Sequence, residues 1–169
     1  LNADVGSISV TVTATDAAGV TISDSFAIAV ANTNDAPTAI ALSATAIDEN
    51  AAGAVVDTLT TTDVDVGDTH TYSLSGTDAD SFEVVNGQLK RKDTVSADYE
   101  TKNSYSVMVT ATDVAGASVS QNFTVTVTNV NEKPTAIALS ASAINENVTG
   151  AVVGTLTTTD VDAGDSHTY

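Results

Sequence analysis

Hydrophobic and polar residues alternate with a period of two along most of this chain. Between Tyr105 and Ala111, for example, Tyr105, Val107 and Val109 are separated by Ser, Met and Thr. Such alternation puts the apolar side chains on one face of a β-strand, whereas a helix would repeat them every three or four positions. Because no helical stripe of useful length occurs, the pattern predicts an all-β fold. The expected strands and hairpin cover residues 38–47, 54–62, 70–75, 82–89, 105–111 and 119–127.

The segment from Phe82 to Leu89 is expected to form a hairpin, because Asn86-Gly87 supplies the left-handed turn residues that two-residue connections prefer. Seven short strands within about 97 residues pack most economically as a seven-stranded Greek-key β-sandwich of the immunoglobulin-like type. The side chains expected in its core are Ile40, Leu42, Val55, Leu59, Tyr72, Leu74, Phe82, Val84, Leu89, Tyr105, Val107, Val109, Phe123, Val125 and Val127.

The sequence repeats itself with a period of 97 residues. Asp16 and Asp113 occupy the same position in two copies, and so do Tyr72 and Tyr169, with no insertion between them. A fixed period of this kind is the signature of a tandem array. We expect the end of one repeat over residues 1–34, a complete repeat over 35–131 and the start of another over 132–169. Since neither end falls at a repeat boundary, the polypeptide is expected to continue in both directions.

The chain is strongly acidic. Five Lys and Arg against 22 Asp and Glu give a formal net charge of −17. Nucleic-acid binding needs clustered basic side chains, so this class of partner is excluded. Cysteine is absent, which excludes disulfide bonds and thiolate metal sites. No apolar run approaches the ~20 residues that span a bilayer, so direct membrane insertion is not expected. The charge instead favours binding of cations.

The acidic residues gather at expected strand ends and at the joints between repeats. Five short motifs contain Glu49, Asp63, Asp98, Asp113 and Asn131, in that order. Calcium takes six to eight oxygen ligands, and short Asp-x-Asp or Asp-x-Glu segments let two carboxylates converge on one ion. Asp, Asn and Gly are also ordinary turn formers, so each motif alone is weak. Their common order, partly restated 97 residues away, indicates calcium binding.

Together these motifs resemble those of bacterial cadherin-like tandem repeats, and the resemblance covers the whole chain. It rests on Glu49-Asn50, Asp98-Tyr-Glu100, Asp63-Val-Asp65, Asp160-Val-Asp162, Asp113, Asn32-Thr-Asn34-Asp35-Ala-Pro37 and Asn129-Val-Asn131-Glu132-Lys-Pro134. The resemblance implies that calcium lies between successive repeats. The joint between the second and third repeats would then use Glu49, Asp98, Glu100, Asn131, Glu132, Asp160 and Asp162. The joint between the first and second would use Asn34, Asp35, Asp63, Asp65 and Asp113.

The first joint departs from this pattern. The positions that correspond to Asp98 and Glu100 are Leu1 and Ala3, so the Asp-x-Glu pair is missing there. In the linkers, Asn also stands for the first Asp of the motif, and Glu132 stands for a later Asp. We therefore expect fewer or weaker ions at the first joint than at the second.

The resemblance implies a structural and adhesive repeat of a large extracellular protein at a bacterial cell surface. Calcium would stiffen the joints for cell adhesion or for assembly of a filament or biofilm matrix. Its partners would be neighbouring repeats of the same chain and identical chains in a filament or matrix.

Two other functions were weighed. An enzyme is not expected, because the only histidines, His70 and His167, are one position in two copies and the sequence singles out no nucleophile for them. A structural role for His70 beside the Asp63 loop is favoured instead. A calcium-dependent polysaccharide-binding module is the alternative function, but sugar platforms need exposed aromatic rings. Trp is absent, and only Tyr99 is free of the expected core.

Overall fold

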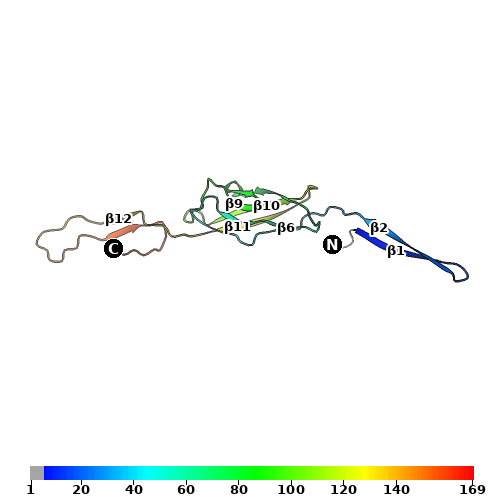
Figure 1. The fold of residues 1–169 in the computed structure, drawn as a ribbon. Helices are drawn as coiled ribbons and strands as arrows, with labels where there is room; N and C mark the ends of the chain where they lie inside the picture. Colours follow the sequence, from blue (N-terminus) through cyan, green and yellow to red (C-terminus); the bar gives the residue numbers. More distant parts are fainter. Residues whose placement is uncertain (1–5) are drawn as a thin grey trace.

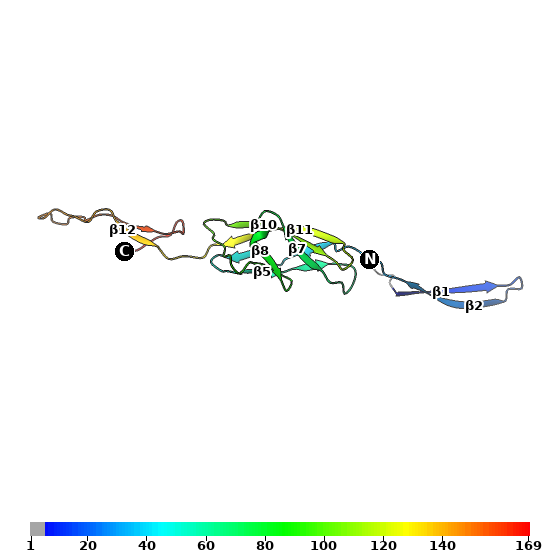
Figure 2. The same cartoon turned by 90° about the horizontal axis from the view of Figure 1, so that it is seen from above.

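The structure, a computed structural model, describes residues 6–169. It is elongated, with a compact β-sandwich in the middle, a long hairpin at the N-terminal end and a more open segment at the C-terminal end (Figures 1 and 2). No helix in residues 6–169 has the length and apolar character needed to cross a membrane. Leu1 and Ala3, which bear on the first joint, lie outside the described residues.

The middle part contains nine strands. They are β3 (Ala39–Ala41), β4 (Ala46–Asp48), β5 (Val55–Thr58), β6 (Thr60–Thr62), β7 (Thr71–Ser75), β8 (Phe82–Val85), β9 (Gln88–Arg91), β10 (Ser104–Thr112) and β11 (Ser118–Thr128), with one 3-10 turn, η1 (Ala79–Ser81). One layer is the four-stranded sheet β4-β11-β10-β7, and the other is formed by β5-β9-β8 and β3-β6. The all-β sandwich predicted from the alternation is confirmed. The turn at Asn86 and Gly87 also forms, with φ angles of 51° and 75°.

The first expected strand, 38–47, is wrong as a single element. Its first half pairs antiparallel with β6, whereas its second half crosses to the other layer and pairs parallel with β11. The carboxylate of Asp57 fixes the crossing, since it accepts hydrogen bonds from the backbone amides of Ser43 (2.6 Å) and Ala44 (2.9 Å). The hydrogen bond from the Ser43 hydroxyl, followed by those from the amides of Thr58, Ala44 and Ser43, lowers the pKa of Asp57 from 3.8 to about 2.

The core lies between the two layers, and most of the residues expected there are buried or partly buried in it. Val55 is an exception, because its side chain is 48% exposed while the neighbouring Val56 is 6% exposed. A bulge in the pairing of β5 with β9, between Val55 and Asp57, shifts the alternation by one position. A one-residue shift turns side chains to the opposite face, which is why the period-two pattern selected the wrong valine.

The core also holds a cation that the pattern did not predict. Arg91 is 2% exposed, and its guanidinium carbon lies 4.3 Å from the centre of the Tyr105 ring and 5.4 Å from that of Phe82. Its Nη2 donates to the Ser96 carbonyl (3.0 Å), while Nε and Nη1 have no hydrogen-bond partner among the described residues. Contacts with the ring faces therefore compensate part of the cost of burying this charge.

The two flanking segments repeat parts of the sandwich. Strands β1 (Gly6–Thr15) and β2 (Thr21–Val30) pair as β10 and β11 do, and β12 (Ala136–Leu139) pairs with β13 (Leu156–Thr159) as β3 does with β6. Their apolar faces are open, since Phe26 is 51% exposed and Ile137 67% exposed. These segments therefore extend the array at both ends of the middle sandwich.

Candidate metal centre

Glu49 anchors the joint between the second and third repeats. Glu49 comes directly after β4 and is only 3% exposed. Oε2 accepts a hydrogen bond from the Tyr99 amide and Oε1 accepts one from the Val130 amide, both at 2.8 Å. The next residue, Asn50, takes the left-handed conformation (φ 60°), which asparagine tolerates better than most residues. The Glu-Asn motif thus turns the chain while it fixes a carboxylate at the base of the sandwich.

Two acidic triads meet at this joint. Glu49, Asp98 and Glu100 have carboxylate oxygens within 4.8 Å of one another, and so do Glu100, Glu132 and Asp162. Glu100 belongs to both triads, and Asp162 comes from the third repeat. The five carboxylates therefore form two neighbouring groups that share Glu100, and each group could hold a cation.

The linker holds the second triad in place. The Glu132 amide donates to Asp162 Oδ2 (2.6 Å), and the Asn50 amide group donates to Glu132 Oε1. The other oxygen, Glu132 Oε2, is buried and has no hydrogen-bond partner among the described residues. A buried carboxylate oxygen without a donor is costly, and a coordinated cation would remove that cost.

Negative charge at this joint is poorly compensated. Partial loss of hydration raises the pKa of the Glu100 carboxyl, and the charges of Glu49, Glu132 and Asp162 raise it further. The lysines that form ion pairs within residues 6–169 do so with Glu83, Asp93 and Asp78, none of which belongs to the triads. The joint is thus a strongly negative site.

Water can reach the joint through an open cleft beside Glu100. It is lined by Tyr99, Asn103 and Asn129 of the second repeat and by Ala163 of the third. The Asn129 amide group donates to Glu100 Oε1 at 3.2 Å. The cleft provides an entry path for a hydrated ion.

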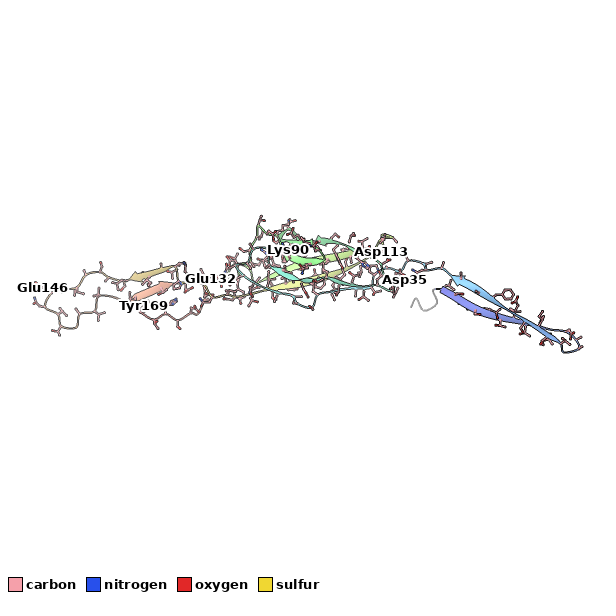
Figure 3. The ribbon with its side chains drawn as sticks, viewed as in Figure 1. Asp35, Lys90, Asp113, Glu132, Glu146 and Tyr169 are labelled. Atoms are coloured by element: carbon pink, nitrogen blue, oxygen red, sulfur yellow. The ribbon has the colours of Figure 1, made fainter. Side chains whose placement is uncertain are left out.

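The other joint lies at the opposite end of the middle sandwich, where Figure 3 shows Asp35 and Asp113, while Glu132 lies at the far end. Its triad consists of Asp63, Asp68 and Asp113, and all three residues belong to the second repeat. The Asn34 amide group donates to Asp113 Oδ2 (2.9 Å), and this bond is the main reason that the pKa of Asp113 is lowered.

Asp68 was missing from the ligands expected at the first joint. Asp68 is the last acidic residue of the segment that begins with Asp63-Val-Asp65. Gly67, with a φ of 96°, turns the chain just before Asp68. Asp68 Oδ2 is buried without a hydrogen-bond partner among the described residues. The glycine in this acidic loop was the signal that could have identified Asp68 as a member of the triad. Glycine readily adopts the positive φ that the turn requires.

Five expected ligands lie at the joints but outside the triads, namely Asn34, Asp35, Asp65, Asn131 and Asp160. Asp65 accepts from the Asp35 amide at 2.6 Å, the Asn131 amide group donates to the carbonyl of the next residue at 2.8 Å, and Asp160 pairs with His167. They shape the linkers and loops around the triads; their oxygens are not among the three-carboxylate groups. Asn34, being an amide residue, likewise lies outside them while contacting Asp113.

The histidine pairs recur in both copies. His70 Nε2 lies 2.9 Å from Asp63 Oδ2, and His167 Nε2 lies 2.9 Å from Asp160 Oδ2. The bond from His167 is the main cause of the lowered pKa of Asp160. His70 therefore lies beside the Asp63 loop as expected, and its ring orients that carboxylate.

The aromatic ring weighed for sugar binding is not a free platform. Tyr99 is partly buried and packs against the core of the sandwich. Its backbone amide also donates to Glu49. The residue is therefore part of the base of the joint.

The residues at the second joint fit calcium. The donors are carboxylate and amide oxygens, which are the ligands of this hard cation. The group includes an orphaned buried oxygen on Glu132, and its carboxylates repel one another when nothing lies between them. Glu49, Asp98, Glu100, Glu132 and Asp162 would hold the ions.

Comparison with known proteins gives structural neighbours. No protein-family model matches the chain, and no curated protein sequence matches it. Among solved structures, it is 28% identical to human protocadherin-24 EC1-2 over 76% of this chain and 61% of that one, with a TM-score of 0.62.

Two further neighbours are PcdhgB3 EC1-4 and the protocadherin gammaB7 EC3-6 cis-dimer, each 26% identical with a TM-score of 0.61. The matches cover 74% and 95% of this chain but only 32% and 41% of the neighbours. The chain thus spans less than two thirds of the length of these structures. It has the β-sandwich fold of extracellular cadherin domains.

Proposed function

We propose that this chain is a segment of an extracellular adhesive array whose joints are stiffened by calcium. The observation that carries the proposal is the pair of triads that share Glu100 and draw on two repeats. We also propose that repeats end at residues 34 and 131, and that the array lies at a bacterial cell surface or in a biofilm matrix. The extracellular cadherin domains among its structural neighbours support an external, non-catalytic role.

The mechanism follows from charge. Without a cation, the carboxylates of Glu100, Glu132 and Asp162 crowd one linker and repel one another, so the two repeats can move apart. Calcium supplies the positive charge that turns these groups into shared ligands, and each shared ligand then restrains one repeat against the next. Asp162, supplied by the third repeat, is thus the group through which calcium binding restrains that repeat.

The energy available is substantial. Extracellular calcium modules bind at about 0.1 to 1 mM, so ~10 mM calcium at a 0.1 mM site adds roughly 2.7 kcal/mol. For a domain of this size that corresponds to a rise in melting temperature of about 10–20 °C. Stability and stiffness are therefore expected to change together on calcium binding.

Chelation tests the proposal. Removal of calcium should lower the melting temperature and raise the flexibility of the chain in small-angle scattering. Asp80→Asn is a matched control, because Asp80 is an exposed carboxylate in η1 and belongs to no triad. Its response to calcium should equal that of the natural sequence. Identical scattering profiles with calcium and with chelator would overturn the calcium-joint mechanism.

Association of identical chains is the second part of the proposal. One structural neighbour, protocadherin gammaB7 EC3-6, was solved as a cis-dimer. That dimer of a structural neighbour supports a second copy of this chain as a partner in a filament or matrix.

A further inference from the structure

The outer face of the four-stranded sheet differs in chemistry from the rest of this acidic chain. On three of its four strands the outward positions are 71, 73 and 75 of β7, the even positions of β10 and the even positions of β11. Twelve of these 14 positions carry serine or threonine, and the others are Met108 and Asn122. We name these 14 positions the hydroxyl face. These 14 positions carry no charge, although the chain as a whole carries −17. The edge strand β4 adds one carboxylate to this side of the sheet, that of the exposed Asp48 beside Thr128.

The outer side of the opposite sheet carries charged residues. It carries Glu83 on β8 and Lys90 on β9, and Lys90 Nζ lies 3.6 Å from Glu83 Oε1. The absence of charge on the hydroxyl face is therefore not a general property of this sandwich.

Two hydroxyl groups on the face already satisfy each other. Thr110 Oγ1 lies 2.7 Å from Ser120 Oγ across β10 and β11. The same pair recurs 97 residues earlier, where Thr13 Oγ1 lies 2.7 Å from Ser23 Oγ. Polar groups that are paired within a surface cost less to remove from water than unpaired ones. The face can therefore be covered by another surface at a low desolvation cost.

We propose that the hydroxyl face is the surface through which two copies of this array pack side by side. Charge selects the occupant, because like-charged chains repel wherever carboxylates face one another. A second copy can approach most closely through β7, β10 and β11, whose outward positions bear no carboxylate, with Asp48 confined to the β4 edge of the sheet. Threonine methyl groups and mutually bonded hydroxyls then supply a surface complementary to itself.

The area of the face limits the strength of this contact. Three strands spaced ~4.8 Å apart and about 30 Å long cover roughly 400 Å². A stable interface needs about 800 Å² from each partner, so one repeat supplies about half. Two or more repeats must engage together, and linked contacts of this kind gain affinity from one another. The inference therefore rests on the proposed function, since stiff joints are needed to hold successive faces in line.

Sedimentation of the whole chain in ~10 mM calcium tests the inference. Thr124→Glu puts a charge on the hydroxyl face at an exposed position of β11, and Thr60→Glu puts the same charge on exposed β6 of the other sheet. We expect concentration-dependent association of the natural chain, weakened about tenfold or more by Thr124→Glu and unchanged by Thr60→Glu. Melting temperatures of both variants would confirm that they fold.

Three results would overturn the inference: a natural chain that stays monomeric at all concentrations, association that both variants weaken equally, or association that neither variant weakens. The last would assign the contact to the open apolar faces of the flanking segments. Binding of a neutral glycan by a monomeric chain, lost in Thr124→Glu, would also overturn it and assign the face to sugar. Scattering of the same samples reports joint stiffness separately, so a failure of the calcium mechanism is distinguishable.

Discussion

Replacement of Glu100 by glutamine should have opposite effects on stability with and without calcium. Glu100 is the carboxylate shared by both triads at the second joint. Glutamine keeps the shape of the side chain and removes its charge. In calcium the variant loses one charged ligand from each of two sites, whereas in chelator it loses one member of a repelling cluster.

The loss of stability that Glu100→Gln causes in calcium can be calculated. If each site weakens tenfold from ~0.1 mM, its contribution at ~10 mM calcium falls from about 2.7 to about 1.4 kcal/mol. Two sites then lose about 2.6 kcal/mol together, which lowers the melting temperature by about 10–20 °C.

In chelator, Glu100→Gln should change the stability in the opposite direction. The pKa of Glu100 is raised above its ordinary value of 4.5 by lost hydration and by neighbouring carboxylates. A raised pKa in the folded state means that stability is greatest below the unfolded value and falls as the pH rises through the folded value. At neutral pH the ionised group therefore destabilises the calcium-free joint, and Glu100→Gln should melt at a higher temperature than the natural chain.

Thermal melts at pH 7, in ~10 mM calcium and in chelator, measure both effects. Asp80→Asn serves again as the charge-matched control and should give equal shifts in the two buffers. A Glu100→Gln variant that melts lower by the same amount with and without calcium would refute the reasoning, because it would make Glu100 a structural group and not a ligand.

Three other predictions concern the sandwich. Val56→Ala should cost about 1–2.5 kcal/mol in urea unfolding and Val55→Ala under about 0.5 kcal/mol; equal costs would place the bulge elsewhere. Arg91→Met should be near neutral, whereas Arg91→Ala should cost about 2–4 kcal/mol because it leaves a cavity beside Tyr105; a large loss in the methionine variant would show that the guanidinium bonds dominate. Asp57 should titrate near pH 2 by NMR, so its stabilising effect is present above pH 3.8 and lost as the pH falls through about 2; a midpoint near 3.8 would show that the crossing loop is open in solution.

Much of the fold could be predicted because the alternation of side chains follows the pleat of the strands. Val107, Val109 and Val125 are fully buried, as the pattern requires. The pattern failed where the backbone breaks its own period, at the bulge beside Val55. The pattern also gave no sign that Arg91 would be buried, because a period-two pattern contains no information on which rings will cover a cation.

The carboxylates of Glu49, Asp98, Glu100, Glu132 and Asp162 come together in two groups that share Glu100, and their role as calcium ligands stays a prediction. The order of the motifs predicted which carboxylates lie at one joint. The distances between these carboxylates depend on loop conformation, which the motifs do not specify. Asp160 turns toward His167, and Asp68 joins its own triad through the turn at Gly67. Neither arrangement follows from spacing alone. The predicted difference between the two joints stays a prediction.

The most direct test of the account is a calorimetric calcium titration of the natural chain and of Asp162→Asn. Asp162 belongs to the third repeat, whereas the other two members of its triad precede it in the second repeat and the linker. The account predicts binding at about 0.1–1 mM in the natural chain, about tenfold weaker binding at the second joint in Asp162→Asn, and no change in Asp80→Asn. A titration of Asp162→Asn that matches the natural chain would contradict the claim that calcium joins two repeats.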